Sequence, residues 1–145
     1  AIWTNVQPDI FQLHGKESPD RVREIRDRFG AKVMKVIRVA DSDDARSAEA
    51  YDGVADLILF DAKPPKGQDT LPGGNGLIFD WMALTAYRGN TPWMLAGGLN
   101  ASNVAEAIRV TGAKAVDTAS GAEDAPGVKN PAKIQAFVSA ALQTN

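Results

Sequence analysis

The chain has 145 residues, 44% of them hydrophobic, with a formal net charge of −2 and a pI near 5.3. This length predicts one packed domain over residues 1–145, and the small charge gives no general attraction to nucleic acid or to an acidic membrane. The chain has no cysteine, which excludes disulfides and a thiol nucleophile, and only one histidine, which excludes multi-histidine metal sites. No apolar run is long enough to span a membrane, so we expect a cytoplasmic protein. The opening residues Ala1–Asn5 have no initiator methionine and suggest that the chain begins inside a structured region.

The first expected elements are a short strand over Ile10–Leu13 and an amphipathic helix. Ser18 and Pro19 are typical of a helix N-cap and first position, and Gly30 is typical of a helix end. The surrounding arginines predict a solvated face, opposite the apolar residues Val22, Ile25 and Phe29.

An alternating β-branched run predicts a strand over Val33–Val39. By parity, Lys35 and Arg38 lie on opposite faces of this strand, so one of them would point inward. A surface cation is the simpler interpretation of either residue.

The later elements follow the same alternation of strand and helix. A final helix begins at Asn130–Pro131 and is expected to bury Ile134, Phe137, Val138, Ala141 and Leu142. Before it, strands and helices are expected in the order: helix from Asp41 to Tyr51, strand Asp56–Phe60, helix Phe79–Tyr87, strand Thr91–Ala96, helix Ser102–Thr111 and strand Lys114–Asp117.

Five strand–helix units with no hairpin signal predict an α/β fold with parallel strands. Two architectures fit this order, namely a doubly wound open sheet and part of a (β/α)8 barrel. No G-x-G-x-x-G fingerprint follows the first strand, which favours the barrel, although five units are fewer than eight.

Polar or glycine-rich sequence follows every expected strand, and in a parallel β/α arrangement these ends share one face. Asp61 follows an apolar run and precedes the glycine-rich Gly73–Gly76, which predicts a catalytic acid under a loop, with a strand-capping carboxylate as the alternative. Asp117 is a second candidate acid. His14 is a candidate ligand contact, although a structural hydrogen bond explains a lone histidine as well.

Glycines at two later strand ends predict a phosphate site. Gly97 and Gly98 let the backbone approach a ligand closely, and Ser120 and Gly121 add a hydroxyl and further N–H groups. Tight turns are the simpler explanation of each loop alone. Backbone amides from the last two loops of a barrel commonly hold phosphate, so the pair favours a cradle.

Several strings together resemble the phosphoribosylanthranilate isomerase family, a (β/α)8 barrel of tryptophan biosynthesis. They are QLHG (Gln12–Gly15), LFDAKPP followed by LPGGNG and FDW, LAGGLN (Leu95–Asn100), and VDTASGAE with PGVKNPAKI (Val116–Ile134). They follow the family's order and spacing over nearly the whole chain and correspond to strands four to eight of its barrel. The resemblance therefore implies an incomplete barrel that lacks the first three strands.

The resemblance implies an isomerase that converts N-(5′-phosphoribosyl)anthranilate to 1-(2-carboxyphenylamino)-1-deoxyribulose 5-phosphate, with no metal or organic cofactor. The acid matching Asp61 protonates the ring oxygen, and a cysteine on the family's first strand removes the C2′ proton. Asp117, His14 and Gly74 match substrate contacts, and the phosphate loops match Gly97, Gly98, Ala119, Ser120 and Gly121. No nucleic-acid or membrane partner is implied, and a homodimer is compatible with the family.

The chain departs from the family pattern in two ways. The cysteine base and an arginine that meets the anthranilate carboxylate have no counterpart, and Asp117-Thr118-Ala119-Ser120-Gly121 stands where the family usually has DVSSG. We therefore expect the isolated 145-residue chain to be inactive. Two alternatives stay open: a non-catalytic phosphate-binding fragment, and another phosphosugar barrel such as indoleglycerol-phosphate synthase.

Overall fold

A computed structural model of the chain describes residues 5–62 and 81–143. Their main sheet has four parallel strands in the sequential order β1-β2-β3-β4. The strands are β1 (Ile10–Leu13), β2 (Lys32–Val39), β3 (Leu57–Ala62) and β4 (Trp93–Ala96). The predicted parallel arrangement is therefore confirmed for these four strands.

The fifth predicted strand, Lys114–Asp117, is wrong as a full strand. This segment runs beside β4, where Leu95 N–H donates to Ala115 O at 3.0 Å and Asp117 N–H donates to Leu95 O at 2.8 Å. Only the pair Leu95–Val116 forms a parallel bridge, because the chain turns after Asp117 into the short 3-10 helix η3 (Ser120–Ala122). The segment still continues the sheet order past β4.

Helices α2 and α3 begin at the capping residues that the sequence predicts, whereas α4 begins at Val104, two residues after the predicted Ser102. In α2, Ser18 Oγ accepts a hydrogen bond from Arg21 N–H at 3.3 Å, and Gly30 ends the helix with a φ of 63°. Asp41 caps α3 by accepting hydrogen bonds from the N–H groups of Asp43 and Asp44. The helices are α2 (Pro19–Phe29), α3 (Ser42–Ser47), η1 (Ala48–Tyr51), η2 (Trp81–Ala86), α4 (Val104–Thr111) and α5 (Pro131–Leu142).

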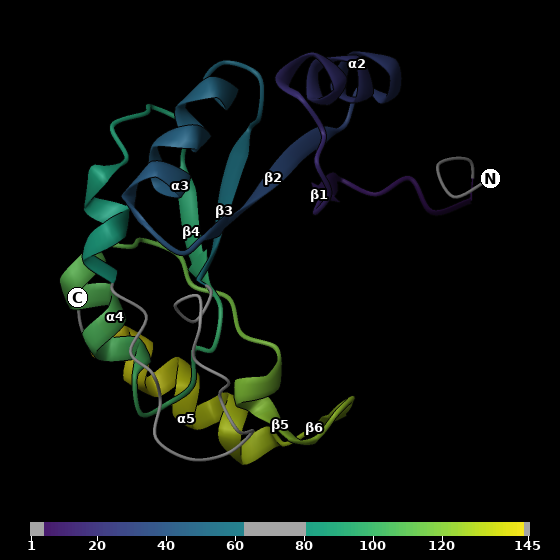
Figure 1. The fold of residues 1–145 in the computed structure, drawn as a ribbon. Coiled ribbons are helices and arrows are strands. Elements are labelled where there is room, and N and C mark those ends of the chain that lie inside the picture. Colours follow the sequence, from purple (N-terminus) through teal and green to yellow (C-terminus); the bar gives the residue numbers. More distant parts are fainter. Residues whose placement is uncertain (1–4, 63–80, 144–145) are drawn as a thin grey trace.

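The helices follow one another along one side of the sheet, from α2 through α3 to α4 and α5 (Figure 1). Neighbouring contacts link α3 with η2, η2 with α4, and α4 with α5. A doubly wound sheet would carry helices on both faces. Sequential parallel strands with their helices on one side are the arrangement of a β/α barrel, here open because the described strands do not close into a ring.

Each face of the sheet has its own apolar cluster. The large core lies between the strands and the helices and includes Ile58, Phe60 and Leu95, all fully buried. On the opposite face, Val36, Leu59 and Ala96 form a smaller cluster with Met34 and Met94 packed against it. Residues of like parity on neighbouring strands therefore form two separate layers.

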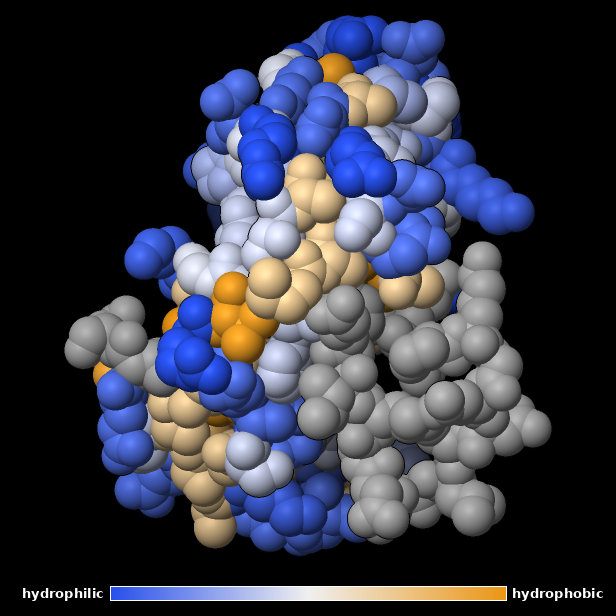
Figure 2. All heavy atoms as spheres, turned by 60° about the vertical axis from the view of Figure 1, so that its left-hand side comes forward, coloured by the Kyte–Doolittle hydropathy of each residue, from blue (hydrophilic) through white to orange (hydrophobic). Residues whose placement is uncertain are grey.

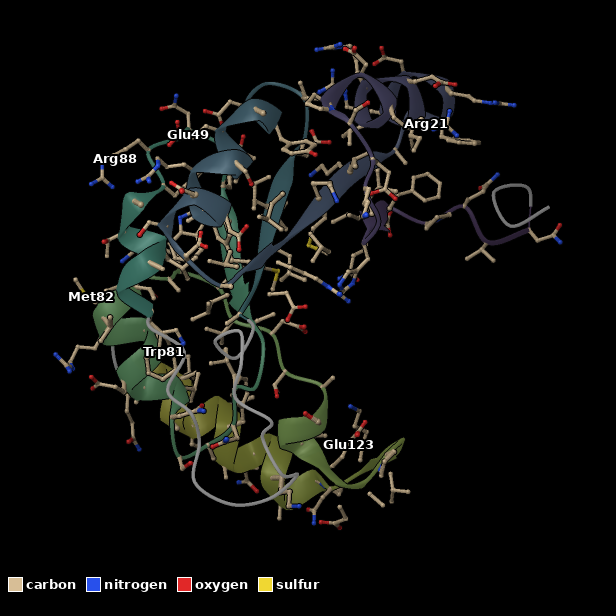
Figure 3. The ribbon with its side chains drawn as sticks, in the orientation of Figure 1. Arg21, Glu49, Trp81, Met82, Arg88 and Glu123 are labelled. Carbon is tan, nitrogen blue, oxygen red and sulfur yellow. The ribbon has the colours of Figure 1, made fainter. Side chains whose placement is uncertain are left out.

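Polar contacts join the helical layer at its surface. Arg88 N–H donates to Glu49 Oε1 at 3.1 Å, and the two residues lie near each other in Figure 3. Met82, at the start of η2, points outward and is 58% exposed. Figure 2 brings this side forward and shows a largely hydrophilic surface in its upper part, where α2 and α3 lie. The predicted solvated face of α2 is confirmed by its arginines, since the side chains of Arg21 and Arg23 are 53% and 48% exposed.

Three details of the sequence prediction are wrong. Lys35 is not a surface cation, because its residue is only 2% exposed. An antiparallel hairpin, β5 (Glu123–Ala125) with β6 (Val128–Lys129), follows η3 although the sequence shows no hairpin signal. In α5 only Phe137 is buried, whereas Ile134, Val138 and Leu142 are 43%, 48% and 64% exposed. That side of α5 has no described element packed over it.

No helix among residues 5–62 and 81–143 combines the length and apolar character needed to cross a bilayer. That residues 1–145 form a single domain stays a prediction.

Candidate functional site

Asp61 is the second-last residue of β3, whereas the sequence predicted that it lies beyond the end of the strand. In the sheet register it stands opposite Arg38 on β2 and Ala96 on β4. Leu59, two residues earlier, belongs to the smaller apolar cluster, so Asp61 lies on that same face by parity. The carboxylate therefore projects from the sheet face opposite the described helices, near the carboxyl ends of the strands.

A cavity of about 270 Å³ opens at these strand ends. Seven of the site residues predicted from the sequence line it: His14, Asp61, Gly97, Gly98, Asp117, Ala119 and Ser120. The other lining residues are Gln12, Leu59, Ala96 and Thr118. The structure thus brings together residues that are up to 106 positions apart in the sequence, from His14 to Ser120.

Three polar side chains meet at one edge of this cavity. Arg38 Nε–H donates to His14 Nε2 at 3.3 Å, and His14 Nε2 lies 3.6 Å from Asp61 Oδ2. Arg38 Nε is itself 3.8 Å from Asp61 Oδ2. Arg38 Nε and Asp61 Oδ2 thus both approach the same imidazole nitrogen, His14 Nε2. The site therefore holds a carboxylate, an imidazole and a guanidinium within contact of one another.

The loop after β4 is the first of the two loops that the sequence predicts as a phosphate cradle. Gly97 and Gly98 have φ values of 92° and 65°, a left-handed region that other residues rarely adopt. Asn103 Nδ2 donates to Gly98 O at 3.1 Å, and Asn103 Oδ1 accepts from Asn100 N–H at 2.8 Å. These bonds fix the shape of the loop that lines the cavity.

The second half of the cradle is held from outside the cavity. Lys129 Nζ donates to Ala119 O at 2.9 Å and to Glu123 Oε1 at 2.8 Å, and this second bond holds the pKa of Glu123 below its usual range. Thr118 Oγ1 donates to Leu99 O at 2.6 Å. Side chains therefore fix both loops by hydrogen bonds. Of these side chains only Thr118 lines the cavity.

Two predicted residues are not part of the observed cavity. Gly74 lies outside the described residues, together with the rest of the glycine-rich loop. Gly121 does not line the cavity, and a Cβ at this position would collide with Leu99 O and Thr118 Oγ1. A glycine is therefore needed at position 121 for packing between the two loops.

Sequence reasoning gave no role in the site to Arg38 or to the lining residues Gln12, Leu59, Ala96 and Thr118. Parity alone places Arg38 on one of two faces, and its partner Asp61 is apparent only once β2 and β3 are in register. Thr118 stands between the predicted residues Asp117 and Ala119 in a string that departs from the family's usual one. That departure from the usual string could have drawn attention to Thr118.

Two larger hollows, of about 450 and 350 Å³, lie at the opposite end of the strands. Residues at the start of β1 and β2, such as Asp9 and Lys32, line them. Catalytic groups of β/α barrels gather at the carboxyl ends of the strands, which favours the smaller cavity around Asp61 as the site. Across the described ranges 5–62 and 81–143, no cluster of three or more potential metal ligands occurs.

Comparison with known proteins identifies the family. A model of the N-(5'phosphoribosyl)anthranilate (PRA) isomerase family matches residues 1–140. The chain belongs to this family. Phosphoribosylanthranilate isomerases of Parvibaculum lavamentivorans and Paramagnetospirillum magneticum are each 56% identical to it, over 142 and 141 residues. These matches cover 97% of the chain but only 66% and 65% of the two relatives, so the chain spans slightly less than two thirds of their length.

Solved structures agree with this family assignment. The phosphoribosylanthranilate isomerase of Thermotoga maritima superimposes with a TM-score of 0.79 at 34% identity, covering 98% of this chain and 65% of that one. The 3-hexulose-6-phosphate synthase of Salmonella typhimurium gives a TM-score of 0.68 at 17% identity and shares the fold alone. The expected fold class, an incomplete β/α barrel of the isomerase family, is thereby confirmed.

Proposed function

We propose that this chain forms the phosphate-binding and general-acid part of a phosphoribosylanthranilate isomerase. The observation that carries the proposal is the single cavity in which Asp61 faces the glycine loops after β4 and before η3. The substrate would be N-(5′-phosphoribosyl)anthranilate, in keeping with the family. A relative was solved with reduced 1-(o-carboxyphenylamino)-1-deoxyribulose 5-phosphate bound, which supports a ligand of this class.

The residues of the cavity divide the proposed work. The N–H groups around Gly97, Gly98, Ala119 and Ser120 would bind the phosphate, and Gly121 would keep the two loops in contact. Asp61 would protonate the ribose ring oxygen, so that the C1′–O bond breaks and a protonated Schiff base forms at C1′. Asp117 and His14 would contact the sugar or the anthranilate, and Gly74 is proposed for the same role on sequence grounds alone.

The second half of the reaction needs a base. Removal of the C2′ proton from the protonated Schiff base gives an enamine, which tautomerises to the ketone product. The family's base is a cysteine, and this chain contains none. We therefore propose that the 145-residue chain alone does not turn over substrate, and that activity belongs to a protein that also supplies this cysteine.

The test has two arms. In a protein that contains this chain together with the cysteine-bearing segment, Asp61→Asn should lower turnover on the order of 10²–10⁴-fold and leave substrate binding nearly unchanged. Asp27→Asn is the matched control, because Asp27 is 65% exposed and remote from the cavity, and it should behave as the wild type. Near-normal turnover of the Asp61 variant would refute the acid assignment.

The second arm uses the 145-residue chain as it is. Isomerase activity above background would refute the proposed need for the cysteine. Inorganic phosphate should bind and shift the amide resonances of Gly97, Gly98 and Ser120 rather than those of remote residues. Binding without turnover is also what a phosphate-binding fragment would show, so only the first arm separates these two functions.

One solved structure shows monomers generated from the dimeric phosphoribosylanthranilate isomerase of Thermotoga maritima. We extend that to this protein only as a proposal that the family's homodimer is available to it.

A further inference from the structure

Lys35 is the one charged residue classed as buried among the described residues, and the proposed reaction does not use it. It lies on β2 and is 2% exposed, on the same face as the buried Val33 and Ile37 and opposite to Arg38. An ammonium in such a place is strongly destabilising unless every N–H donor finds an acceptor. Its partners therefore show what the protein uses this charge for.

The ammonium of Lys35 holds the loop between β1 and α2. Its Nζ donates to Gly15 O at 2.9 Å, Val36 O at 3.0 Å, Glu17 Oε2 at 3.2 Å and Leu13 O at 3.3 Å. Three N–H groups are shared among these four acceptors. Three of the four belong to the end of β1 or to the loop that follows it, so Lys35 acts mainly on that loop.

Glu17 completes the contact from the loop side. Its carboxylate accepts Gly15 N–H at 3.1 Å as well as the Lys35 ammonium. Burial raises the pKa of Glu17, but hydrogen bonds from the backbone and from Lys35, with the Lys35 charge, outweigh it and leave the pKa below its usual range. The folded loop therefore stabilises the ionised form of Glu17.

Tyr51 closes the arrangement from η1. Its hydroxyl donates to Glu17 O at 2.8 Å, and its ring centroid lies 5.9 Å from Lys35 Nζ. Lys35 on β2, Glu17 in the loop and Tyr51 on η1 thus all hydrogen-bond to the backbone of residues 13–17. We call these three residues the loop clamp.

His14 lies in the backbone segment that the loop clamp holds. Lys35 holds the carbonyls of Leu13 and Gly15, one on each side of it. The His14 side chain is 46% exposed, so little packing holds it in place beside Asp61. Apart from the hydrogen bond from Arg38 Nε, its position 3.6 Å from Asp61 Oδ2 then depends on the backbone that carries it, and the loop clamp fixes that backbone.

We propose that Lys35 is a positioning residue, whose buried ammonium, with Glu17 and Tyr51, keeps His14 beside Asp61 in the candidate site. The inference rests on the proposed function for the use made of His14, but the placement itself is measurable without catalysis. A failure of the isomerase assay would leave this measurement standing, and the reverse also holds.

His14 is the only histidine of the chain, so its ring signals in an NMR spectrum are assigned without ambiguity. In the otherwise unchanged chain, Asp61→Asn should shift these signals, because it removes the carboxylate beside the ring. In a Lys35→Met background the same Asp61 change should lose most of its effect on the ring. A Lys32→Met background is the control, since Lys32 lies on the same strand, is exposed, and should leave the Asp61 effect intact.

A second variant covers the case in which Lys35→Met does not fold. Tyr51→Phe removes one hydroxyl and keeps the ring, and it too should weaken the effect of Asp61→Asn on His14. A full Asp61 effect in folded Lys35→Met, or in Tyr51→Phe where the former does not fold, would overturn the proposal. It would mean that the loop clamp supports the fold without placing His14.

Discussion

Asp52 is the residue that joins the end of η1 to the start of β4. Its carboxylate accepts hydrogen bonds from Thr91 Oγ1 at 2.7 Å, Asn90 N–H at 2.8 Å and Thr91 N–H at 3.1 Å. Tyr87 Oη donates to it at 3.2 Å. Because Thr91 is buried, its hydroxyl and N–H groups need acceptors within the protein, and the Asp52 carboxylate supplies them. One side chain thereby satisfies the polar groups of a whole turn.

This arrangement predicts a pH-dependent stability. The Thr91 hydroxyl, aided by the Asn90 and Thr91 N–H groups, lowers the pKa of Asp52 from its ordinary value of 3.8. The folded protein binds this proton less readily than the unfolded chain does. The stabilisation is therefore complete above the ordinary pKa and is lost as the pH falls through the lowered one.

We expect Asp52→Asn to lower the free energy of unfolding by about 1–3 kcal/mol at pH 7, measured by urea denaturation. The difference from the wild type should shrink below about pH 4, where the unfolded wild-type chain begins to bind a proton at Asp52, and should vanish below the lowered pKa of the folded protein. Asp20→Asn is the control, because its pair with Arg23 is exposed and should contribute little. An equal loss at pH 7 and pH 3 would contradict the role of the charge.

Lys35 and Arg38 show how far residue-level prediction reaches. Strand periodicity places them correctly on opposite faces of β2, and Arg38 lies on the sheet face that also carries Asp61. Periodicity does not reveal that the loop after β1 folds over Lys35 and supplies its acceptors. A buried cation is predictable only when its partners are known, and those partners are 18 to 22 positions away in the sequence.

At the scale of elements, the loop after β4 offers a matched pair of glycines. Both have positive φ, but an added Cβ at Gly97 would collide with the backbone of Ala62, whereas one at Gly98 would meet nothing. Gly98→Ala should therefore cost only the left-handed conformation, on the order of 1–2 kcal/mol of unfolding free energy. Gly97→Ala should cost more, because β3 and the loop must separate.

The two alanine variants are compared by urea denaturation at neutral pH. The same order should appear in phosphate binding, since a displaced loop moves its N–H groups away from the cavity. Equal stability losses for the two variants would show that backbone conformation alone requires these glycines. A larger loss for Gly98→Ala would contradict the packing argument.

Helix α5 shows what local sequence can and cannot predict about an element. Asn130 Oδ1 accepts the N–H groups of Ala132 and Lys133, as the Asn-Pro start predicts. The apolar stripe, by contrast, predicts burial that only Phe137 shows. Capping depends on residues next to the helix, whereas burial depends on which other element is packed against it. The hairpin β5–β6 was missed because its two short strands pair through few residues.

At the scale of the whole molecule, the candidate site follows from topology more than from any one motif. Parallel strands in sequential order bring all their carboxyl ends to one edge, so residues from His14 to Ser120 line one cavity. Seven of the residues predicted from the sequence line this cavity, whereas Gly121 does not and Gly74 lies outside the described residues. Their pairing, such as Arg38 with His14, depends on register and loop shape, which periodicity does not carry.

The same topology predicts a gradient of stability across the sheet. Strand β3 lies between two neighbours, with Ile58 and Phe60 fully buried, whereas among the described strands β1 pairs with β2 alone, and Ile10 is 43% exposed. In hydrogen exchange by mass spectrometry or NMR, the amides of β3 should exchange slowest. Those of Ile10–Leu13 should exchange orders of magnitude faster, since an edge strand opens without disturbing the core.

Dilution supplies the control for this prediction. The gradient should persist at low protein concentration, where each chain is isolated. Protection of β1 that matches β3 at every concentration would contradict it, because the outer edge of β1 would then be closed within a single chain. Protection that disappears on dilution would leave the gradient intact for the monomer and would show that a second copy covers the edge, since an unpaired row of N–H and C=O groups readily pairs with another strand.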